Sequence, residues 1–416
     1  MREQYGFCNE VDLPRRSAEG EKRSLLYQFG KFRKVTPPPA ESMKATIQRT
    51  AAKYPKTRVP SGFHTYKMGV TDKAIKEAFH QVTFKSGPGV PLAALATTKG
   101  EFVDKYLDLG VRAVRQRLHL LNSTQPIPKT ARELIQHGYC DPCRVFEKNE
   151  PHPLGKLEEG RTRIITSLSL IDEVIERLLF GPQNNAEIDQ WEDIPSKPGI
   201  GFSDEQNAVF WNHIKDFVAE AAESDISGYD FSVQFFMFVM DLHVRRLCNG
   251  ASKDSAWWRI ATNRIRCLTL SVFVTSDGEM FEQLVAGIMK SGSYITSSTN
   301  SRIRVMSSDL VGSEWAEAMG DDACEQWIEN AIEKYHELGF RMKFYRRCSG
   351  NIEFCSHLYS DSGAYLLSHE KGLFNLLNSP PSLELLAQFL HEYRGSPHLP
   401  GMAMAISGSG WIPKLD

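Results

Sequence analysis

Two short stretches decide the fold of this chain, and they read Asp225-Ile226-Ser227-Gly228-Tyr229-Asp230 and Met319-Gly320-Asp321-Asp322-Ala323. The first places one aspartate at the end of a predicted strand and a second one five residues later. The second is typical of a tight hairpin turn with two carboxylates at its tip. On its own the second stretch is weak evidence, because a solvated turn also explains it. Together, carboxylates on two adjacent strands form the usual site for a pair of divalent ions in phosphoryl transfer.

A third stretch lies between these two and combines a glycine loop with the start of a polar helix. It reads Lys290-Ser291-Gly292-Ser293-Tyr294-Ile295-Thr296 and is followed by Asn300. Hydroxyl and amide side chains at these positions are not what a buried helix face would carry. They offer both donors and acceptors, and therefore indicate a polar ligand.

The order of the three stretches, Asp-x4-Asp, Ser-Gly-x3-Thr-x3-Asn and Gly-Asp-Asp, resembles the palm of positive-strand virus RNA-directed RNA polymerases. The amino-acid sequences of residues 148–152, 225–234, 318–322 and 354–357 are similar to those of polymerases from the sobemovirus, polerovirus and barnavirus group. The resemblance covers roughly residues 84–360. No motif of the family is recognised before or after that range.

The resemblance implies an α+β fold shaped as a right hand, with an antiparallel palm sheet flanked by helices. The fingers would occupy residues 1–185, which begin with a basic arm, and an insertion at 250–280. The palm would hold residues 186–249 and 281–350. The thumb, with a palm-to-thumb hairpin, would hold residues 351–416.

The resemblance also implies roles for individual residues. Asp225, Asp321 and Asp322 would bind two Mg²⁺ ions, for which Mn²⁺ can substitute. Lys343 would be the general acid that protonates the leaving pyrophosphate. The nucleotide would be bound by Lys148, Lys156, Arg161, Arg163, Asp230, Ser291, Thr296 and Asn300, and RNA by Ser86, Gly87, Pro88, Gly292, Cys355, Ser356 and His357.

For two of these groups of residues, the implied role also has a direct chemical explanation. The basic residues between positions 148 and 163 suit a triphosphate, because fixed positive charges stabilise the charge that develops on the transferred phosphoryl group. A solvated surface is the other interpretation, since glutamates are interleaved with them. Asp230, Ser291 and Asn300 would read the ribose 2′-hydroxyl, the group that distinguishes RNA from DNA substrates.

The implied activity is template-directed transfer of ribonucleotides to an RNA 3′-hydroxyl, which replicates a viral RNA genome. The partners would be an RNA template, nascent RNA, ribonucleoside triphosphates and a viral genome-linked protein primer. A reverse transcriptase is disfavoured because it usually places an aromatic residue where the 2′-hydroxyl would clash. A non-catalytic RNA-binding scaffold is disfavoured because all three carboxylates are present.

The net charge of −2 hides a segregation of charge along the chain. Residues 1–180 carry 30 basic and 20 acidic residues, whereas residues 181–416 carry 19 and 31. Such asymmetry points towards nucleic acid or an acidic site. We therefore expect a positive tunnel around an acidic floor that binds metal.

Composition and local sequence patterns indicate in which compartment of the cell we expect the protein. The 416 residues contain 41% apolar and 24% charged residues, which are ordinary globular values. No apolar run is long enough to cross a membrane. The polar N-terminus lacks the apolar core of a signal peptide, and the eight cysteines are scattered. We expect a reducing host cytoplasm, with attachment to membrane replication complexes through other viral proteins. Cys140 and Cys143 have the spacing of half a zinc site, but the other half is missing.

Hydrophobic periodicity predicts the remaining elements. The first sixty residues should be an arm that wraps around the molecule and does not pack into a core. A strand should end at residue 225, a strand pair should lie around 267–281, and another strand at 340–345. A Gly-Pro-rich link is expected around 181–201. Helices are predicted at 72–79, 101–121, 130–137, 164–180, 205–222, 233–247, from 294 onwards, and at 323–338.

Overall fold

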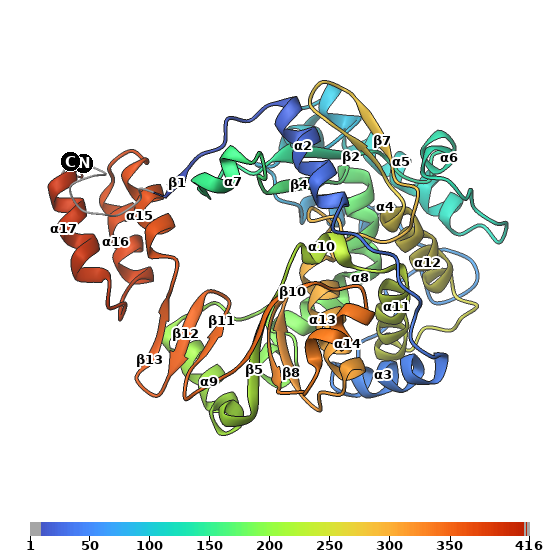
Figure 1. Ribbon diagram of the computed structural model, residues 1–416. Helices are drawn as coiled ribbons and strands as arrows, with labels where there is room; N and C mark the ends of the chain where they lie inside the picture. The colour runs from blue at the N-terminus through green and yellow to red at the C-terminus, as the bar shows by residue number, and fades with distance from the viewer. Residues whose placement is uncertain (1–9, 412, 414–416) are drawn as a thin grey trace.

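A four-stranded antiparallel sheet lies at the centre of the computed structural model, which describes residues 10–411 and 413 (Figure 1). Its strands follow in the order β10 (Met342–Arg347), β5 (Ala221–Ile226), β9 (Asp322–Gln326) and β8 (Ala316–Met319). Helices α13 (Thr296–Val311) and α14 (Ala331–Glu337) pack against it. Small residues allow α13 to approach closely, because Val305 of the helix contacts Ala318 and Ala323 of the sheet. The predicted antiparallel sheet with flanking helices is present.

A second sheet, which is mixed, lies above the first in the view of Figure 1. Its order is β4 (Ile164–Ser167), β2 (Cys143–Glu147), β6 (Val272–Val274) and β7 (Met280–Glu282), and only β2 and β6 run parallel. One large apolar core joins this sheet to the surrounding helices. Those helices are α4 (Asp72–His80), α5 (Lys99–Leu121), α6 (Ala131–Gln136), α8 (Leu170–Asp189), α11 (Phe235–Asn249) and α12 (Ala256–Thr269).

A network of buried charges links α8, α11 and α13. Arg302 of α13 is fully buried and contacts Glu187 of α8, and its Nε lies 2.6 Å from Oδ1 of Asp241 in α11. Arg245 joins the same aspartate at 3.1 Å. Every charge in this network has a partner of opposite sign, as buried charges require.

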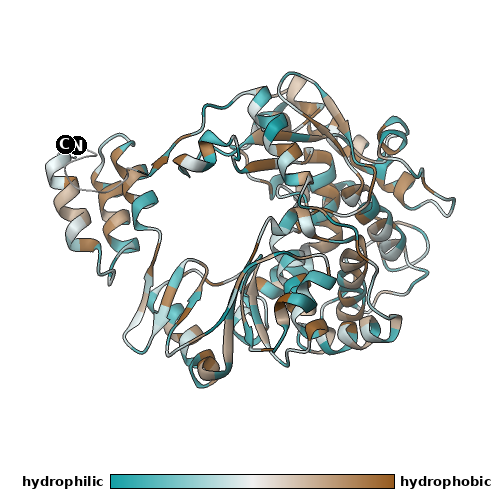
Figure 2. Cartoon of the chain, viewed as in Figure 1, coloured by the Kyte–Doolittle hydropathy of each residue, from teal (hydrophilic) through white to brown (hydrophobic). Residues whose placement is uncertain are grey.

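The C-terminal part forms a separate apolar cluster that stands apart from the main body (Figure 1). It follows the small sheet β11 (Ile352–Phe354), β12 (His357–Ser360) and β13 (Gly363–Leu366). Its helices are α15 (His369–Leu377), α16 (Leu383–Glu392) and α17 (Leu399–Ser409). Figure 2 shows hydrophobic segments in these helices as well as in the main body.

The N-terminal strand bridges the two parts. β1 (Val11–Asp12) pairs with β3 (His152–Pro153), which leads into α7 (Leu154–Glu158), while Val11 packs into the C-terminal cluster. The expected wrapping arm is therefore present at this point. The expectation that the arm does not pack was wrong, because α2 (Ala18–Phe29) and α3 (Ala40–Ala52) bury residues such as Leu25 and Ala51 in the main core.

Several predicted boundaries were also wrong. The segment 164–180 begins as strand β4, and α8 then continues through Pro182 into the expected loop. The segment 205–222 is α9 (Asp204–Ile214), then η3 (Lys215–Glu220), then β5. Residues 323–326 after the Asp-Asp pair belong to β9, since they pair with β5 and β8, and the predicted helix begins only at Ala331, as α14. Short apolar runs do not distinguish strand from helix, and pairing decided each case.

The remaining elements are short. They are η1 (Leu92–Ala94), η2 (Trp191–Asp193) and α10 (Tyr229–Ser232). In the part of the chain that the structure describes, no helix combines the length and apolar character needed to cross a membrane.

Candidate active site

Three aspartates meet at one edge of the central sheet. Asp225 lies next to the end of β5, and Ser224 pairs with Ala323, so Asp225 and Asp322 follow one position further along the adjacent strands. Asp321 lies in the two-residue turn between Met319 and Asp322. Gly320 begins that turn with a φ of 63°, which glycine adopts without steric cost. Strand pairing therefore brings together residues almost a hundred positions apart.

The three carboxylates repel one another. Partial burial, followed by the charges of Asp321 and Asp225, raises the pKa of Asp322 to about 7. Burial and the charge of Asp225 also raise the pKa of Asp321. Such a cluster fits a hard divalent cation, which prefers oxygen ligands. Among the described residues no three His, Cys, Asp or Glu side chains already form a closed metal site, so an ion would have to draw these carboxylates together.

Lys343 is positioned by an irregularity in β10. The pairing of β10 with β5 shifts between Met342 and Phe344, and such a bulge redirects a side chain. Lys343 Nζ lies 2.6 Å from Oδ2 of Asp225. The predicted general acid is thus next to the predicted metal ligands, where its ammonium compensates one of their charges.

Asp230 and Asn300 form a direct pair beside the carboxylates. Asn300 Nδ2 donates to Asp230 Oδ1 at 2.7 Å, and the Tyr229 hydroxyl donates to the Asn300 carbonyl at 2.8 Å. Asn300 is only 3% exposed, and its Oδ1 has no hydrogen-bond partner among the described residues. Burial and the charge of Asp321 raise the pKa of Asp230 to about 6, although the hydrogen bond from Asn300 opposes this. The structure brings together these two predicted sugar-reading residues.

Ser291 takes a different partner. Its hydroxyl accepts a hydrogen bond from the Thr166 amide at 3.0 Å, and its own amide donates to Thr166 Oγ1 at 2.7 Å. A Cβ on Gly292 would lie 2.6 Å from the Thr166 carbonyl, so only glycine fits there. Thr296 Oγ1 donates to the Lys290 carbonyl at 2.8 Å. The loop is therefore fixed against β4, and Thr296 holds its shape.

Three of the four predicted nucleotide-binding cations form ion pairs with glutamates. Lys148 and Arg163 both contact Glu150, at 2.8 and 2.9 Å. Arg161 pairs with Glu159. The exposed Lys156 has no ion pair among the described residues, and burial together with nearby cations, the first of them Lys343, lowers its pKa. The charge of Arg163 acts on Asp321 and Asp230, so at least this cation lies close to the carboxylates.

The structure adds residues that the motifs did not indicate. A pocket of about 670 Å³ lies beside Lys343. Lys31 of α2 has no ion pair in the described part of the chain, and burial and the charges of Lys343 and Lys156 lower its pKa. The basic composition of residues 1–60 was the only sequence signal for it. The pocket is lined by Leu26, Tyr27, Gly30, Lys31, Ser227, Arg341, Met342 and Lys343.

A strained turn approaches the carboxylates from the C-terminal side. Cys355 and Ser356 connect β11 to β12 with φ values of 50° and 59°. Burial, followed by the charges of Asp322, Cys324 and Asp321, raises the pKa of the Cys355 thiol. His357 stacks on Phe202 with ring centroids 4.4 Å apart. The predicted hairpin is present and its tip faces the site.

The predicted template loop packs against the start of α8. The Lys99 amide donates to the Ser86 carbonyl at 2.8 Å, and the Leu170 amide donates to the Pro88 carbonyl at 2.9 Å. Gly87 is exposed between them. RNA binding by Ser86, Gly87 and Pro88 stays a prediction.

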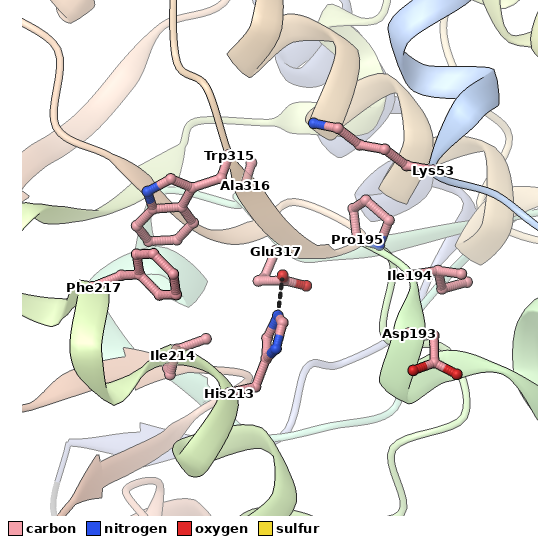
Figure 3. Close-up of a pocket in the computed structure, with 10 residues that line it drawn as sticks. All are labelled: Lys53, Asp193, Ile194, Pro195, His213, Ile214, Phe217, Trp315, Ala316 and Glu317. Carbon is pink, nitrogen blue, oxygen red and sulfur yellow. Dashed lines mark hydrogen bonds and ion pairs between the residues drawn. The ribbon is translucent and has the colours of Figure 1, made fainter.

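A different pocket, of about 320 Å³, lies between α9 and β8 (Figure 3). His213 Nε2 lies 2.9 Å from Glu317 Oε1, and the buried Lys197 lies 2.8 Å from Oε2 of the same residue. The charge of Glu317 is thus already compensated. This pocket contains none of the predicted site residues, so the carboxylate edge is the better candidate for chemistry.

Comparisons with known proteins agree with this geometry. The family described as viral RNA-directed RNA-polymerase matches residues 9–409. The chain is 38% identical over 416 residues to the "Replicase polyprotein P2AB" of Southern bean mosaic virus, covering 96% of this chain and 43% of the relative. It is 36% identical over 392 residues to "Protein P1-P2" of Potato leafroll virus, covering 88% and 36%.

A third relative is "Protein P1-P2" of Pea enation mosaic virus-1, to which the chain is 33% identical over 415 residues. The match covers 91% of this chain and 34% of the relative. The chain thus spans less than half the length of these curated relatives. The family match covers nearly the whole chain, including the arm and the C-terminal helices where no motif was recognised. With the carboxylate edge in place, the resemblance is confirmed: the chain belongs to the viral RNA-directed RNA polymerase family.

Proposed function

We propose that this chain is the catalytic unit of an RNA-directed RNA polymerase that replicates a viral RNA genome. It would copy an RNA template by transferring ribonucleotides from nucleoside triphosphates to the 3′-hydroxyl of the growing strand. The observation that carries this proposal is the convergence of Asp225, Asp321 and Asp322 opposite a pocket lined with cations. Membership of the family supports the same reaction.

The carboxylates would hold two divalent ions, Mg²⁺ or Mn²⁺. Bound there, the ions would stabilise the attacking and leaving oxygens at the α-phosphate. Asp225 and Asp321 would supply carboxylate oxygens to both ions, and Asp322 would be a further ligand. Lys343 then releases Asp225 and gives its proton to the leaving pyrophosphate. The 2.6 Å contact between Lys343 Nζ and Asp225 Oδ2 supports this role, because the ammonium lies next to the carboxylates that would hold the ions.

The triphosphate would be held by the cations around the pocket. Three of them, Lys31, Lys156 and Arg341, have no ion pair among the described residues and are free to bind phosphate. Lys148, Arg161 and Arg163 would exchange their glutamate partners for phosphate oxygens. Fixed cations at this position stabilise the charge of the transferred group.

The Asp230–Asn300 pair would select ribose. A hydroxyl can both donate to and accept from such a pair, and a deoxyribose would leave it unsatisfied. This favours an RNA polymerase over a reverse transcriptase. The loop of Ser291 and Gly292 would support the pair from β4, and Thr296 would fix the loop.

The right-hand architecture is part of the proposal. Residues 1–185 and 250–280 would be the fingers, 186–249 and 281–350 the palm, and 351–416 the thumb. RNA would contact Ser86, Gly87, Pro88 and Gly292 on one side and the hairpin of Cys355, Ser356 and His357 on the other. We place the enzyme in replication complexes of the host cytoplasm. No observation on the described residues favours a protein primer.

The test is incorporation of ribonucleotides on a homopolymer RNA template with and without Mg²⁺. Asp321→Ala should reduce incorporation by at least about a thousandfold, because metal coordination contributes several kcal/mol to the transition state. RNA binding should be retained. Glu333→Ala, which removes an exposed carboxylate from α14, is the matched control. Synthesis by Asp321→Ala at the rate of this control would refute the metal assignment.

A further inference from the structure

A second surface of the protein has features of a binding site and lies outside the candidate active site. Helices α3 and α11 enclose a groove of about 590 Å³. Its floor contains Met43 and Ile47 of α3 and Phe236, Val239 and Met240 of α11. On α11, Phe235 and Leu247 at its margin are each 37% exposed. Exposed apolar residues gathered in this way mark interaction surfaces more often than isolated ones do.

The rim of the groove is positively charged. Lys44, Arg246 and Lys253 line it, and none of them forms an ion pair with another described residue. Arg246 Nε is buried without a hydrogen-bond partner in the same part of the chain. After burial, the charges of Arg246 and Lys253 lower the pKa of His243, which also lines the groove. An apolar floor with an unpaired basic rim suits a helix that is apolar on one face and acidic beside it.

The chain itself carries such a helix. In α16, Leu385, Leu386 and Phe389 pack into the C-terminal cluster. Leu383 and Leu390, two turns apart on the other side, are 49% and 39% exposed. The exposed Ala387 lies between them on the same face.

The charge of α16 is complementary to the groove. The helix carries Glu384 and Glu392 and neither lysine nor arginine. Arg394, just beyond its end, already pairs with Asp204 at 2.7 Å. Figure 1 shows α16 far from both α3 and α11, the helices that line the groove, so the helix does not reach the groove of its own chain.

We propose that α16 of one copy docks in the α3–α11 groove of a second copy. Leu383 and Leu390 would enter the apolar floor, and Glu384 would approach Lys44 or Lys253. The two surfaces differ, so the contact is head-to-tail, and each added copy leaves one free groove and one free helix. One short helix buries less than the roughly 800 Å² per partner of a stable interface, so the association is weak and sensitive to salt.

The first experiment measures self-association of the full chain by sedimentation at increasing protein concentration, at low and high salt. The wild type should form dimers and longer species that dissociate in high salt. Lys44→Glu and Glu384→Lys should each raise the dissociation constant by about tenfold. Combining both in one chain should restore it. Lys67→Glu, an exposed lysine outside the groove, is the control.

The second experiment distinguishes a head-to-tail contact from any other. Val239→Glu places a charge in the apolar floor of the groove, and Leu390→Lys places one on the apolar face of α16. Each variant thus loses one of the two surfaces, so neither should associate alone. An equimolar mixture should form dimers and nothing longer, because each variant keeps one intact surface. All variants should keep the thermal unfolding temperature and nucleotide incorporation of the wild type, since these residues lie outside the active site.

Three results would overturn the proposal. The wild type could remain a monomer at every concentration and salt, as it would if the groove binds another molecule. Association could persist unchanged in both the groove and the helix variants. The mixture of Val239→Glu and Leu390→Lys could remain monomeric although the wild type associates.

Discussion

Two groups of charged side chains in this protein are built in opposite ways. Around Arg302, buried charges of both signs neutralise one another within α8, α11 and α13. At the candidate site, like charges gather instead, with aspartates on the sheet edge and cations around the facing pocket. A paired network needs nothing further, whereas segregated charges are relieved by a ligand that carries the opposite charge. The first group therefore holds the fold, and the second suits the phosphates and metal ions of the proposed function.

The largest effect is expected from the paired network. Arg302→Met should lower the free energy of unfolding by about 3 to 5 kcal/mol, because it leaves Glu187 buried without its partner and leaves Asp241 with Arg245 alone. Urea unfolding followed by circular dichroism measures this. Arg112→Met changes an exposed arginine and should have little effect. Equal stability of the two variants would remove the distinction between the two groups.

A smaller effect, on substrate and not on stability, is expected from the segregated cations. Lys31→Met should raise the KM for nucleoside triphosphate by about tenfold, as loss of a charge-assisted phosphate contact implies, with little change in kcat. The unfolding temperature should stay the same or rise, since like charges repel Lys31. Lys34→Met on the same arm is the control in steady-state kinetics. A fall in stability without a change in KM would assign Lys31 to the fold.

The Asp230–Asn300 pair shares one feature with each group. Its Asn300 is buried, like the Arg302 network, and its Asp230 lies close to the carboxylates of the candidate site. Asn300→Ala should reduce the preference for ribonucleotides over deoxynucleotides by about tenfold, since one hydrogen bond to the sugar pocket is lost. The ratio of kcat/KM for the two substrates measures it, with Ser297→Ala as the control. Unchanged selectivity would take Asn300 out of the sugar-reading role.

Lys290 extends the comparison, because it is a buried lysine that forms no ion pair within residues 10–411. Its Nζ donates to Gln283 Oε1 and to the carbonyls of Gly287 and Ile288, and burial lowers its pKa to about 7. Between that value and its ordinary 10.5, the unfolded chain binds a proton that the folded chain does not, so stability rises with pH.

The prediction compares wild type with Lys290→Met. The free energy of unfolding of the wild type should increase from pH 7 to about pH 9 relative to that of the variant. Urea titrations at both pH values measure the difference. Parallel pH profiles would show that Lys290 stays protonated when folded, held by its three oxygen partners.

Local sequence was sufficient where a residue's role depends on its immediate neighbours. The helices at 72–79, 101–121 and 233–247 follow from apolar spacing, and Gly320 follows from the positive φ of a two-residue turn. The carboxylates were predicted from their order alone. The type of secondary structure was harder to predict for segments that pair with a strand from a distant part of the sequence. The segment after Asp322 has no helical or strand period strong enough to decide, and pairing with β5 makes it β9.

The sequence by itself determined which residues are available for the proposed chemistry, because metal ligands, phosphate-binding cations and sugar-reading amides must be particular residue types in a particular order. Only the tertiary structure decided which of them meet. It paired Asn300 with Asp230, directed Ser291 to Thr166, brought Lys343 to Asp225 through a bulge, and placed Lys31 beside the site. These contacts join residues far apart along the chain, and strand register and helix packing, which set them, depend on the whole core at once.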